Sequence, residues 1–202
     1  MIGLVDYGLG NLEAFASIYR RLGVDVRRLT DPDELTTADR LILPGVGAFD
    51  WAMARLGESG LRQALDEAVL ERSVPVLGVC VGMQMMLESS EEGLLPGLGW
   101  IPGHVARLDA GQGLPLPHMG WNDPELADDP LFAGLDGPRF YFLHSFGAVP
   151  AAPHSSIAEA DYGGRFCCAV RRDHIAGVQF HPEKSHHWGV RLLANFAGID
   201  LD

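Results

Sequence analysis

Residues 75–88 read PVLGVCVGMQMMLE, and this stretch decides the fold. Residues 75–79 form a short apolar run that is typical of a buried strand, and a helical pattern follows over 83–88. Cys80 lies at the junction, with one glycine two positions before it and another two positions after it. This arrangement is typical of a nucleophile elbow, in which a tight strand-to-helix turn lifts a reactive side chain above the sheet. The start of the following helix is expected to favour the thiolate form of the cysteine.

The first half of the chain alternates between strand-like and helix-like segments. Apolar or β-branched runs predict strands, and apolar residues that recur at helical spacing predict helices. The expected strands lie at 2–6, 24–28 and 40–43, and the expected helices at 11–22, 48–56 and 61–72. This β-α-β alternation predicts an α/β fold with a mostly parallel central sheet and helices on both faces.

The second half of the chain has a different pattern. Glycine and proline break residues 98–178 into many short strand candidates with little helical periodicity. A strand is expected at 175–180 and a closing helix at 184–196. We therefore expect one domain over residues 1–202, in which an antiparallel extension continues the parallel sheet.

Composition and charge restrict the class of protein. Hydrophobic residues make up 47% and charged residues 21%, which is ordinary for a soluble globular domain. No apolar run approaches the roughly 20 residues that span a bilayer, and the N-terminus lacks a basic leader, so neither a membrane span nor a secretory signal is expected. Three cysteines are too few for a disulfide framework, which favours a reducing cytoplasm. The net charge of -12, without clustered Lys and Arg, makes nucleic acid an unexpected partner.

A general base for Cys80 is expected about 100 residues further along the chain. His181, Pro182 and Glu183 follow an apolar strand candidate. Residues i and i+2 of an extended chain point to the same side, so the Glu183 carboxylate can orient the imidazole of His181. A carboxylate that orients an imidazole, which in turn contacts a nucleophile, is the arrangement of a catalytic triad.

A glycine-rich loop after the strand at 40–43 is a candidate for transition-state stabilisation. Gly45 and Gly47 flank Val46, and glycine allows peptide orientations that other residues resist. The backbone N–H groups of Val46 and Val81 could together form an oxyanion hole.

Each of these motifs also has an ordinary structural interpretation. Cys80 could be a buried structural cysteine, the His-Pro-Glu tripeptide a surface turn, and the glycine-rich segment a simple turn. The combination of all three is more specific than any one of them.

The three motifs, in this order, resemble the class I glutamine amidotransferases, which have a Cys-His-Glu triad on an α/β sheet. The resemblance extends to the subfamily that serves imidazole glycerol phosphate synthesis. The segments that carry it are 6–12 (DYGLGNL), 43–49 (LPGVGAF), 82–85 (GMQM), 117–122 (PHMGWN), 141–145 (YFLHS), 161–164 (DYGG) and 177–185 (GVQFHPEKS). They extend over nearly the whole chain.

The resemblance implies a reaction and a set of roles. Cys80 would attack the side-chain amide of glutamine, and His181 would protonate the departing ammonia. Other positions match substrate-binding residues of the family: Gly45, Gly47, Gln84, His144 and Ser145.

The resemblance also implies a partner. Ammonia would pass to a synthase subunit with a (β/α)₈ barrel fold, in a heterodimer. Four residues match positions near that subunit contact: Asn11, Trp121, Tyr141 and Lys184. Phe146 departs from the pattern, because related subunits often have tyrosine at this position.

No cofactor or metal is expected. No Walker A run or dinucleotide fingerprint is present. The adjacent pairs Cys167-Cys168 and His186-His187 lack the spacing of structural zinc sites. The remaining histidines are expected to be surface or hydrogen-bonding residues: His104, His118, His154 and His174.

Three other functions remain open from the sequence. The chain could be a glutaminase for another synthase, of anthranilate, aminodeoxychorismate or pyridoxal phosphate. It could be a binding protein without catalysis, although Cys80, His181 and Glu183 are all present. A general cysteine hydrolase with the same elbow is disfavoured by Gln84 and the match at 141–145.

Overall fold

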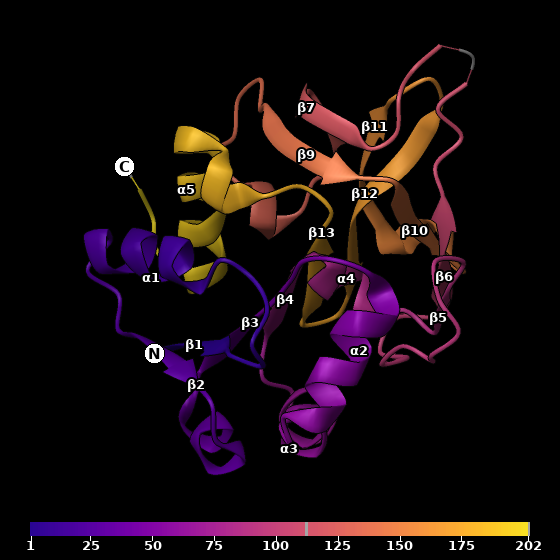
Figure 1. Cartoon of the computed structure of the whole chain (residues 1–202). Coiled ribbons are helices and arrows are strands. Elements are labelled where there is room, and N and C mark those ends of the chain that lie inside the picture. Colours follow the sequence, from indigo (N-terminus) through magenta and orange to yellow (C-terminus); the bar gives the residue numbers. More distant parts are fainter. Residues whose placement is uncertain (112, 202) are drawn as a thin grey trace.

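The parallel part of the fold is a five-stranded arrangement in the computed structural model, which describes residues 1–111 and 113–201 (Figure 1). Its strands follow the order β2-β1-β3-β4-β13, and each pairs in parallel with its neighbours. Their bounds are β2 (Val26–Leu29), β1 (Ile2–Val5), β3 (Arg40–Gly45), β4 (Val76–Cys80) and β13 (Ile175–Val178). The pairing of β4 with β13 brings the end of the chain beside Cys80.

An antiparallel region continues the same sheet beyond β13. The order proceeds from β12 through β10 and β6 to β5, where β5 and β6 pair in parallel. Outside this order, β11 pairs with β12 and β8 pairs with β11. The bounds are β12 (Arg165–Arg172), β10 (Phe146–Pro150), β6 (Gly103–Arg107), β5 (Ser89–Ser90), β11 (Ser156–Asp161) and β8 (Glu125–Leu126). A separate two-stranded ribbon joins β7 (His118–Asn122) to β9 (Phe140–His144). The expected mostly parallel sheet with an antiparallel extension is confirmed.

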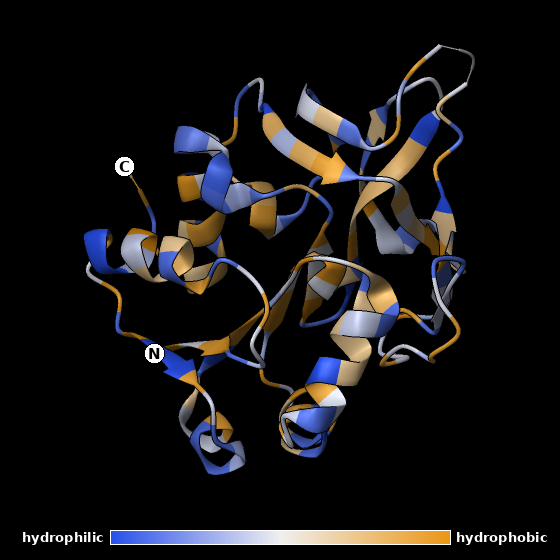
Figure 2. Cartoon of the chain, in the orientation of Figure 1, coloured by the Kyte–Doolittle hydropathy of each residue, from blue (hydrophilic) through white to orange (hydrophobic). Residues whose placement is uncertain are grey.

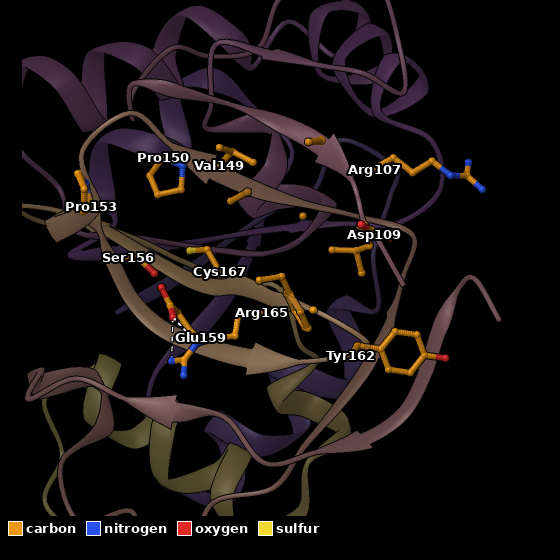
Figure 3. Close-up of a pocket in the computed structure, with 16 residues that line it drawn as sticks. Arg107, Asp109, Val149, Pro150, Pro153, Ser156, Glu159, Tyr162, Arg165 and Cys167 are labelled. Carbon is orange, nitrogen blue, oxygen red and sulfur yellow. Dashed lines mark hydrogen bonds and ion pairs between the residues drawn. The ribbon is translucent and has the colours of Figure 1, made fainter. Parts of the chain in front are cut away.

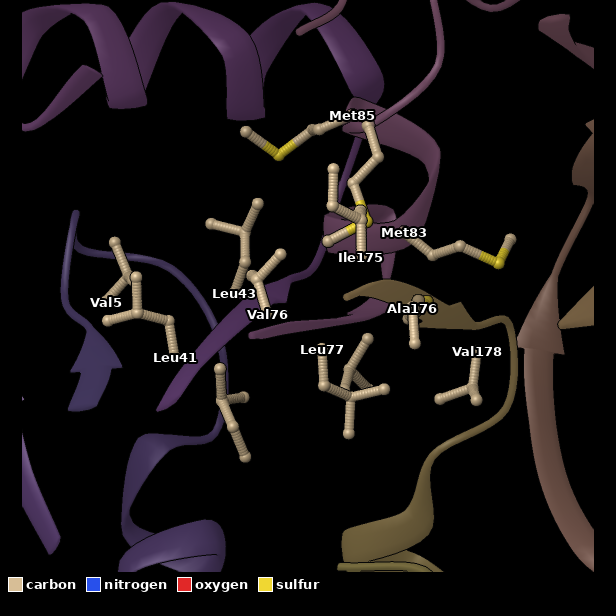
Figure 4. Close-up of a cluster of buried hydrophobic side chains, with 14 of the residues drawn as sticks. Val5, Leu41, Leu43, Val76, Leu77, Met83, Met85, Ile175, Ala176 and Val178 are labelled. Carbon is tan, nitrogen blue, oxygen red and sulfur yellow. The ribbon is translucent and has the colours of Figure 1, made fainter. Parts of the chain in front are cut away.

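Helices cover both faces of the parallel part. On one side, α1 (Leu12–Arg21) contacts α5 (His186–Ala197), and on the other α2 (Phe49–Glu58) contacts α4 (Val81–Met85) and precedes α3 (Arg62–Asp66) (Figure 1). The strands between them are buried on both faces, as parallel strands are. Leu77 and Val178 project to the opposite side of the sheet from Met83 and Met85 (Figure 4). Colouring by hydropathy shows the same division, with hydrophilic residues on the outer faces of the helices (Figure 2).

Several element boundaries differ from the sequence expectation. The helix expected at 83–88 begins directly after Cys80 and ends at Met85. The closing helix begins at His186, because Pro182–Lys184 form a separate 3-10 turn after His181. An unexpected 3-10 helix, Pro32–Thr37, is capped by the Asp31 side chain. No helix in the described ranges is long and apolar enough to cross a membrane.

Candidate active site

Cys80 occupies a strained turn between β4 and α4. Its backbone has φ 56° and ψ -115°, a left-handed conformation that residues with side chains rarely adopt. The turn requires glycine on both sides. A Cβ on Gly78 would lie 2.8 Å from the Gly82 carbonyl oxygen, and a Cβ on Gly82 would lie 1.9 Å from the Leu43 carbonyl oxygen. The thiol is therefore presented at the carboxyl end of the central strand, where ligands of open α/β sheets bind.

His181 and Glu183 form a buried pair next to this turn. The Nδ1 atom of His181 lies 2.9 Å from Oε1 of Glu183, across the 3-10 turn that Pro182 begins. The backbone N–H of His181 donates to the backbone carbonyl of Tyr141 at 2.8 Å, and this bond fixes the backbone at His181. Burial alone would lower the pKa of His181, but hydrogen bonding and negative charge from Cys80 and Glu183 outweigh burial and raise this pKa to about 9.

Cys80 and His181 line the same cavity, of about 330 Å³, which we call the Cys80 cavity. Its size suits a single amino acid side chain and backbone. Eight residues predicted for catalysis, the oxyanion hole or substrate binding line it: Val46, Gly47, Cys80, Val81, Gln84, His144, Ser145 and His181. Glu183 lies behind His181 and is buried, and Lys184 reaches the cavity rim. Four residues that were not predicted as site residues complete the lining with Lys184: Glu92, Pro117, Leu143 and Phe146, which carries the departure from the family pattern.

The strand expected at 40–43 continues to Gly45, so the segment that we call the 44–47 loop consists of the last two residues of β3 and the two that follow, and it lies directly against the nucleophile turn. Gly45 is the register partner of Cys80 in the β3–β4 pair. A Cβ on Gly45 would lie 2.4 Å from the Gly82 nitrogen, so only glycine fits here. Beyond it, Gly47 has φ 85° and Val46 is 40% exposed. The loop is thus packed at its start and open at its end.

Gln84 and Gln179 form a buried amide pair beneath the cavity. Gln84 Nε2 donates to the Phe146 carbonyl at 2.9 Å and to Gln179 Oε1 at 3.0 Å. Gln179 Nε2 in turn lies 3.8 Å from Cys80 Sγ. Sequence reasoning missed Gln179, although the i, i+2 relation used for Glu183 also applies to Gln179 and His181.

Two buried histidines adjoin the cavity on the β7–β9 ribbon. Nδ1 of His144 lies 2.8 Å from the Phe146 carbonyl, so this nitrogen carries the proton and Nε2 is left as an acceptor. His118 stacks on Tyr162, with ring centroids 4.0 Å apart, and lies edge-on to His144 at 5.4 Å. Burial lowers the pKa of His144 to about 3 and the pKa of His118 to about 4. Of the two environments expected for His118, the surface one is wrong, because the ring is 3% exposed among aromatic rings, and the hydrogen-bonding one is confirmed, because its Nε2 lies 3.5 Å from Nδ2 of Asn122.

Three of the four residues predicted at the partner contact form one cluster. Trp121 lies edge-on to Tyr141, with ring centroids 6.0 Å apart, and Lys184 Nζ lies 5.7 Å from the centre of the Tyr141 ring. His186 stacks on the other side of Trp121 at 5.2 Å. Asn11 directly precedes α1, a helix that contacts the Pro182–Lys184 turn. The ribbon also exposes Met119, Trp121 and Leu143, which are large apolar residues.

The other two cysteines lie away from this site, in β12. Both are buried, and burial raises the pKa of Cys167 to about 11 and the pKa of Cys168 well above its ordinary value. Cys167 lines a separate groove of about 540 Å³ on the antiparallel region, with Tyr162 and Arg165 (Figure 3). Within the described ranges, no group of three or more His, Cys, Asp and Glu residues could hold a metal ion.

Comparison with known proteins gives consistent matches over the whole chain. A family model described as glutamine amidotransferase class-I matches residues 3–198. The protein from Bdellovibrio bacteriovorus named imidazole glycerol phosphate synthase subunit HisH is 54% identical over 98% of this chain and 100% of that protein. The proteins of the same name from Leptospira interrogans and Pseudomonas aeruginosa (there HisH 2) are 49% and 43% identical, each with 98% and 100% coverage.

Solved structures show the same fold at low sequence identity. A structure described as a glutamine amidotransferase aligns with a TM-score of 0.75 at 20% identity, over 98% of this chain and 99% of that chain. The glutaminase domain of Trypanosoma brucei CTPS with bound acivicin aligns with a TM-score of 0.66 at 16% identity, over 100% and 95%.

Proposed function

Because the chain belongs to the class I glutamine amidotransferases, and within them to the HisH subunits of imidazole glycerol phosphate synthase, we propose that Cys80, His181 and Glu183 form its catalytic triad. The chain is an enzyme of the glutaminase type. One observation supports the triad most strongly. Cys80 and His181 line one cavity, and Glu183 lies 2.9 Å from the far nitrogen of the imidazole.

The proposed reaction hydrolyses glutamine in two steps. Cys80 Sγ attacks the side-chain amide carbon, and the C–N bond breaks as His181 protonates the nitrogen, which leaves as ammonia. The product of this step is a γ-glutamyl thioester on Cys80. His181 then removes a proton from water, which attacks the thioester and releases glutamate and the free thiol. Glu183 holds the imidazole in the orientation that both proton transfers need.

Two backbone N–H groups are proposed to stabilise the negative charge on the amide oxygen. One belongs to Val81, the first residue of α4, and the other to Val46 on the 44–47 loop. Removal of one such donor costs roughly 2.7–4 kcal/mol of transition-state stabilisation in related chemistry. Support comes from the position of both residues on the wall of the Cys80 cavity.

Substrate glutamine is proposed to contact Gln84, His144 and Ser145, and the backbone at Gly45 and Gly47. Four of these five line the Cys80 cavity, and Gly45 lies beside Cys80 in the β3–β4 register. Gln84 has its amide nitrogen engaged with Phe146 and Gln179. Its carbonyl oxygen and the unpartnered Nε2 of His144 could therefore accept hydrogen bonds from the substrate.

Ammonia is proposed to pass to a synthase subunit with a (β/α)₈ barrel fold, which makes imidazole glycerol phosphate and an aminoimidazole carboxamide nucleotide. The exposed apolar residues Met119, Trp121 and Leu143 support a contact at the ribbon, and Leu143 also lines the Cys80 cavity. Tyr141, Lys184 and Asn11 are proposed to join that contact. The open end of the 44–47 loop suggests that docking re-aims the Val46 N–H and raises activity.

The test compares glutamine hydrolysis by the isolated chain with hydrolysis by the complex, whose synthase is loaded with its nucleotide substrate. We expect the complex to be at least about tenfold faster, because it restores one oxyanion donor. Equal rates would refute gating by the partner. Separate mixtures with anthranilate, aminodeoxychorismate and pyridoxal phosphate synthases provide the partner control. Stimulation by one of these instead would reassign the partner.

A further inference from the structure

Tyr7 is a buried tyrosine that the proposed reaction does not use. It follows β1, is 2% exposed, and belongs to the 6–12 segment that carries the family resemblance. Its hydroxyl donates a hydrogen bond of 2.6 Å to the carbonyl oxygen of Pro44. Pro44 is the first residue of the 44–47 loop, two residues before the proposed oxyanion donor Val46.

The pairing of β3 explains why a side chain is needed at this carbonyl. The register between β1 and β3 ends at Leu4 opposite Ile42, whereas the register between β3 and β4 continues to Gly45 opposite Cys80. Pro44 of β3 therefore has no partner residue in β1. A buried carbonyl without a donor costs free energy, and the Tyr7 hydroxyl supplies that donor.

Close packing fixes the rest of the Pro44–Gly45 peptide. Gly10 has φ 100°, and a Cβ on it would lie 2.6 Å from the Cβ of Pro44, so the turn after β1 packs against the proline ring. Gly45 packs against the Gly82 nitrogen on the other side, where a Cβ would lie 2.4 Å away. Between these two contacts, the Tyr7 hydrogen bond sets the direction of the Pro44 carbonyl.

The Tyr7 hydroxyl also contacts the second element of the proposed oxyanion hole. It lies 3.5 Å from Met85 Sδ in α4, the helix that begins with Val81. Burial raises the pKa of Tyr7 far above its ordinary value, and the negative charge of Cys80 raises it further. The hydroxyl therefore stays protonated and remains a donor throughout the working pH range.

We propose that Tyr7 is a positioning residue for the oxyanion hole, and this inference rests on the proposed glutaminase function. Its hydroxyl anchors the Pro44 carbonyl, which limits the rotations at Gly45 and thereby sets the direction of the Val46 N–H. Tyr7 itself does not line the Cys80 cavity. Its loss should weaken stabilisation of the transition state while leaving the thiol and the binding of glutamine largely intact.

Tyr19 provides a matched control within the same chain. It is also fully buried, and its hydroxyl also donates to a backbone carbonyl, that of Leu193, at 3.2 Å. Its bond joins α1 to α5 and does not touch the 44–47 loop. Tyr7→Phe and Tyr19→Phe therefore remove the same kind of buried hydrogen bond, and only the first bond holds the loop.

The experiment measures kcat and KM for glutamine in the synthase complex of wild type, Y7F and Y19F. Active sites are titrated with iodoacetamide, whose reaction with Cys80 forms no oxyanion. We expect Y7F to lower kcat per titrated site by about tenfold or more, as a displaced oxyanion donor would. KM and the rate of alkylation should change by less than about threefold, and Y19F should keep the wild-type kcat.

The outcomes separate this inference from the proposed function. An inactive wild-type complex would contradict the glutaminase proposal itself. An active wild type with equal kcat in Y7F and Y19F would overturn only the role of Tyr7. If Y7F does not fold, 4-aminophenylalanine at position 7 replaces it. Its weaker N–H donor predicts an intermediate kcat, and a kcat equal to wild type would overturn the inference.

Discussion

The parallel and antiparallel regions of the sheet contribute different parts of the candidate site. The parallel region is buried on both faces and supplies Cys80 together with Val46 and Val81, the proposed oxyanion donors. The β7–β9 ribbon and the segment after it supply His144 and Ser145, and the ribbon exposes Met119, Trp121 and Leu143. By our proposal, the buried parallel region thus holds the reacting cysteine, and the more open region meets the substrate and the partner.

The three cysteines illustrate this difference most directly. Cys80 ends a parallel strand in a strained turn and lines a cavity beside His181. Cys167 and Cys168 lie in the middle of β12, where burial raises the pKa of each thiol. The same residue type is therefore expected to be reactive in one region and inert in the other, because position determines thiolate formation.

The largest expected effect comes from removing the reactive cysteine. Cys80→Ala should reduce glutaminase kcat in the complex by at least about 10⁴-fold, since loss of a nucleophile removes the covalent route. Cys168→Ala, in the antiparallel region, is the matched control and should keep kcat within about twofold. Steady-state ammonia release measures both. Comparable losses in the two variants would break the distinction between the regions.

The next effect concerns the base, which follows β13 at the border of the two regions. Glu183→Gln should lower kcat by about 10²–10⁴-fold with a small change in KM, because the imidazole loses the carboxylate that orients it. Glu159→Gln is a control on the exposed side of β11, where the carboxylate pairs with Arg165. A kcat of E183Q within threefold of wild type would contradict the triad.

Glu183→Gln should also change how the free energy of unfolding depends on pH. The pKa of His181 is raised from 6.5 to about 9 in the folded chain, so its contribution to stability is full below pH 6.5. That contribution is lost as pH rises through about 9, because the unfolded chain releases the proton first. Urea unfolding between pH 6.5 and 9 should show a smaller decline for E183Q than for wild type. Parallel declines would contradict the Glu183 contribution to this pKa.

A smaller effect is expected at the amide pair beneath the cavity. Gln179→Met keeps the side-chain length but removes the contacts with Cys80 and Gln84. We expect kcat to fall by about tenfold, the size typical of one lost hydrogen bond to a charged group. Gln63→Met on α3, where the amide contacts only the exposed Glu67, is the control. Equal kinetics of the two variants would remove Gln179 from the site.

The smallest expected effect concerns His118 in the β7–β9 ribbon and the dependence of stability on pH. Burial lowers the pKa of His118 to about 4, so the unfolded chain binds a proton below pH 6.5 that the folded chain does not. The free energy of unfolding should therefore decrease as the pH is lowered below 6.5. His118→Phe keeps the stacking on Tyr162 and Phe142. When the pH is lowered from 7 to 5, the free energy of unfolding of this variant should decrease by about 1–2 kcal/mol less than that of wild type. Urea unfolding at both pH values measures this, and an equal loss would show that His118 titrates normally.

Local patterns predicted the parallel region well. The alternation of apolar strands and amphipathic helices, the glycines around Cys80 and the i, i+2 relation of His181 and Glu183 are all short-range features. Each is determined by a few neighbouring residues, so the sequence displays it directly. The closing helix begins later than expected because Pro182 starts a separate 3-10 turn after His181.

The roles of Gln179, Tyr7 and His118 depend on contacts between distant segments. In the sequence, Tyr7 belongs to the 6–12 segment without a role of its own, and its bond to Pro44 becomes visible only when β1 and β3 are aligned. The enclosure of His118 likewise depends on the pairing of His118 with His144 in the ribbon. Antiparallel pairing between separated strands leaves no periodic signal that would identify these partners in advance.

The most direct test of the account is labelling with a glutamine-analogue electrophile, followed by identification of the modified peptide. The central claim is that Cys80, activated beside His181, attacks the side chain of bound glutamine. We expect one adduct per chain, on Cys80, whose formation is suppressed by glutamine and slowed in His181→Asn. An adduct on Cys167 or Cys168, or labelling of Cys80 at a rate that neither glutamine nor H181N changes, would contradict that claim.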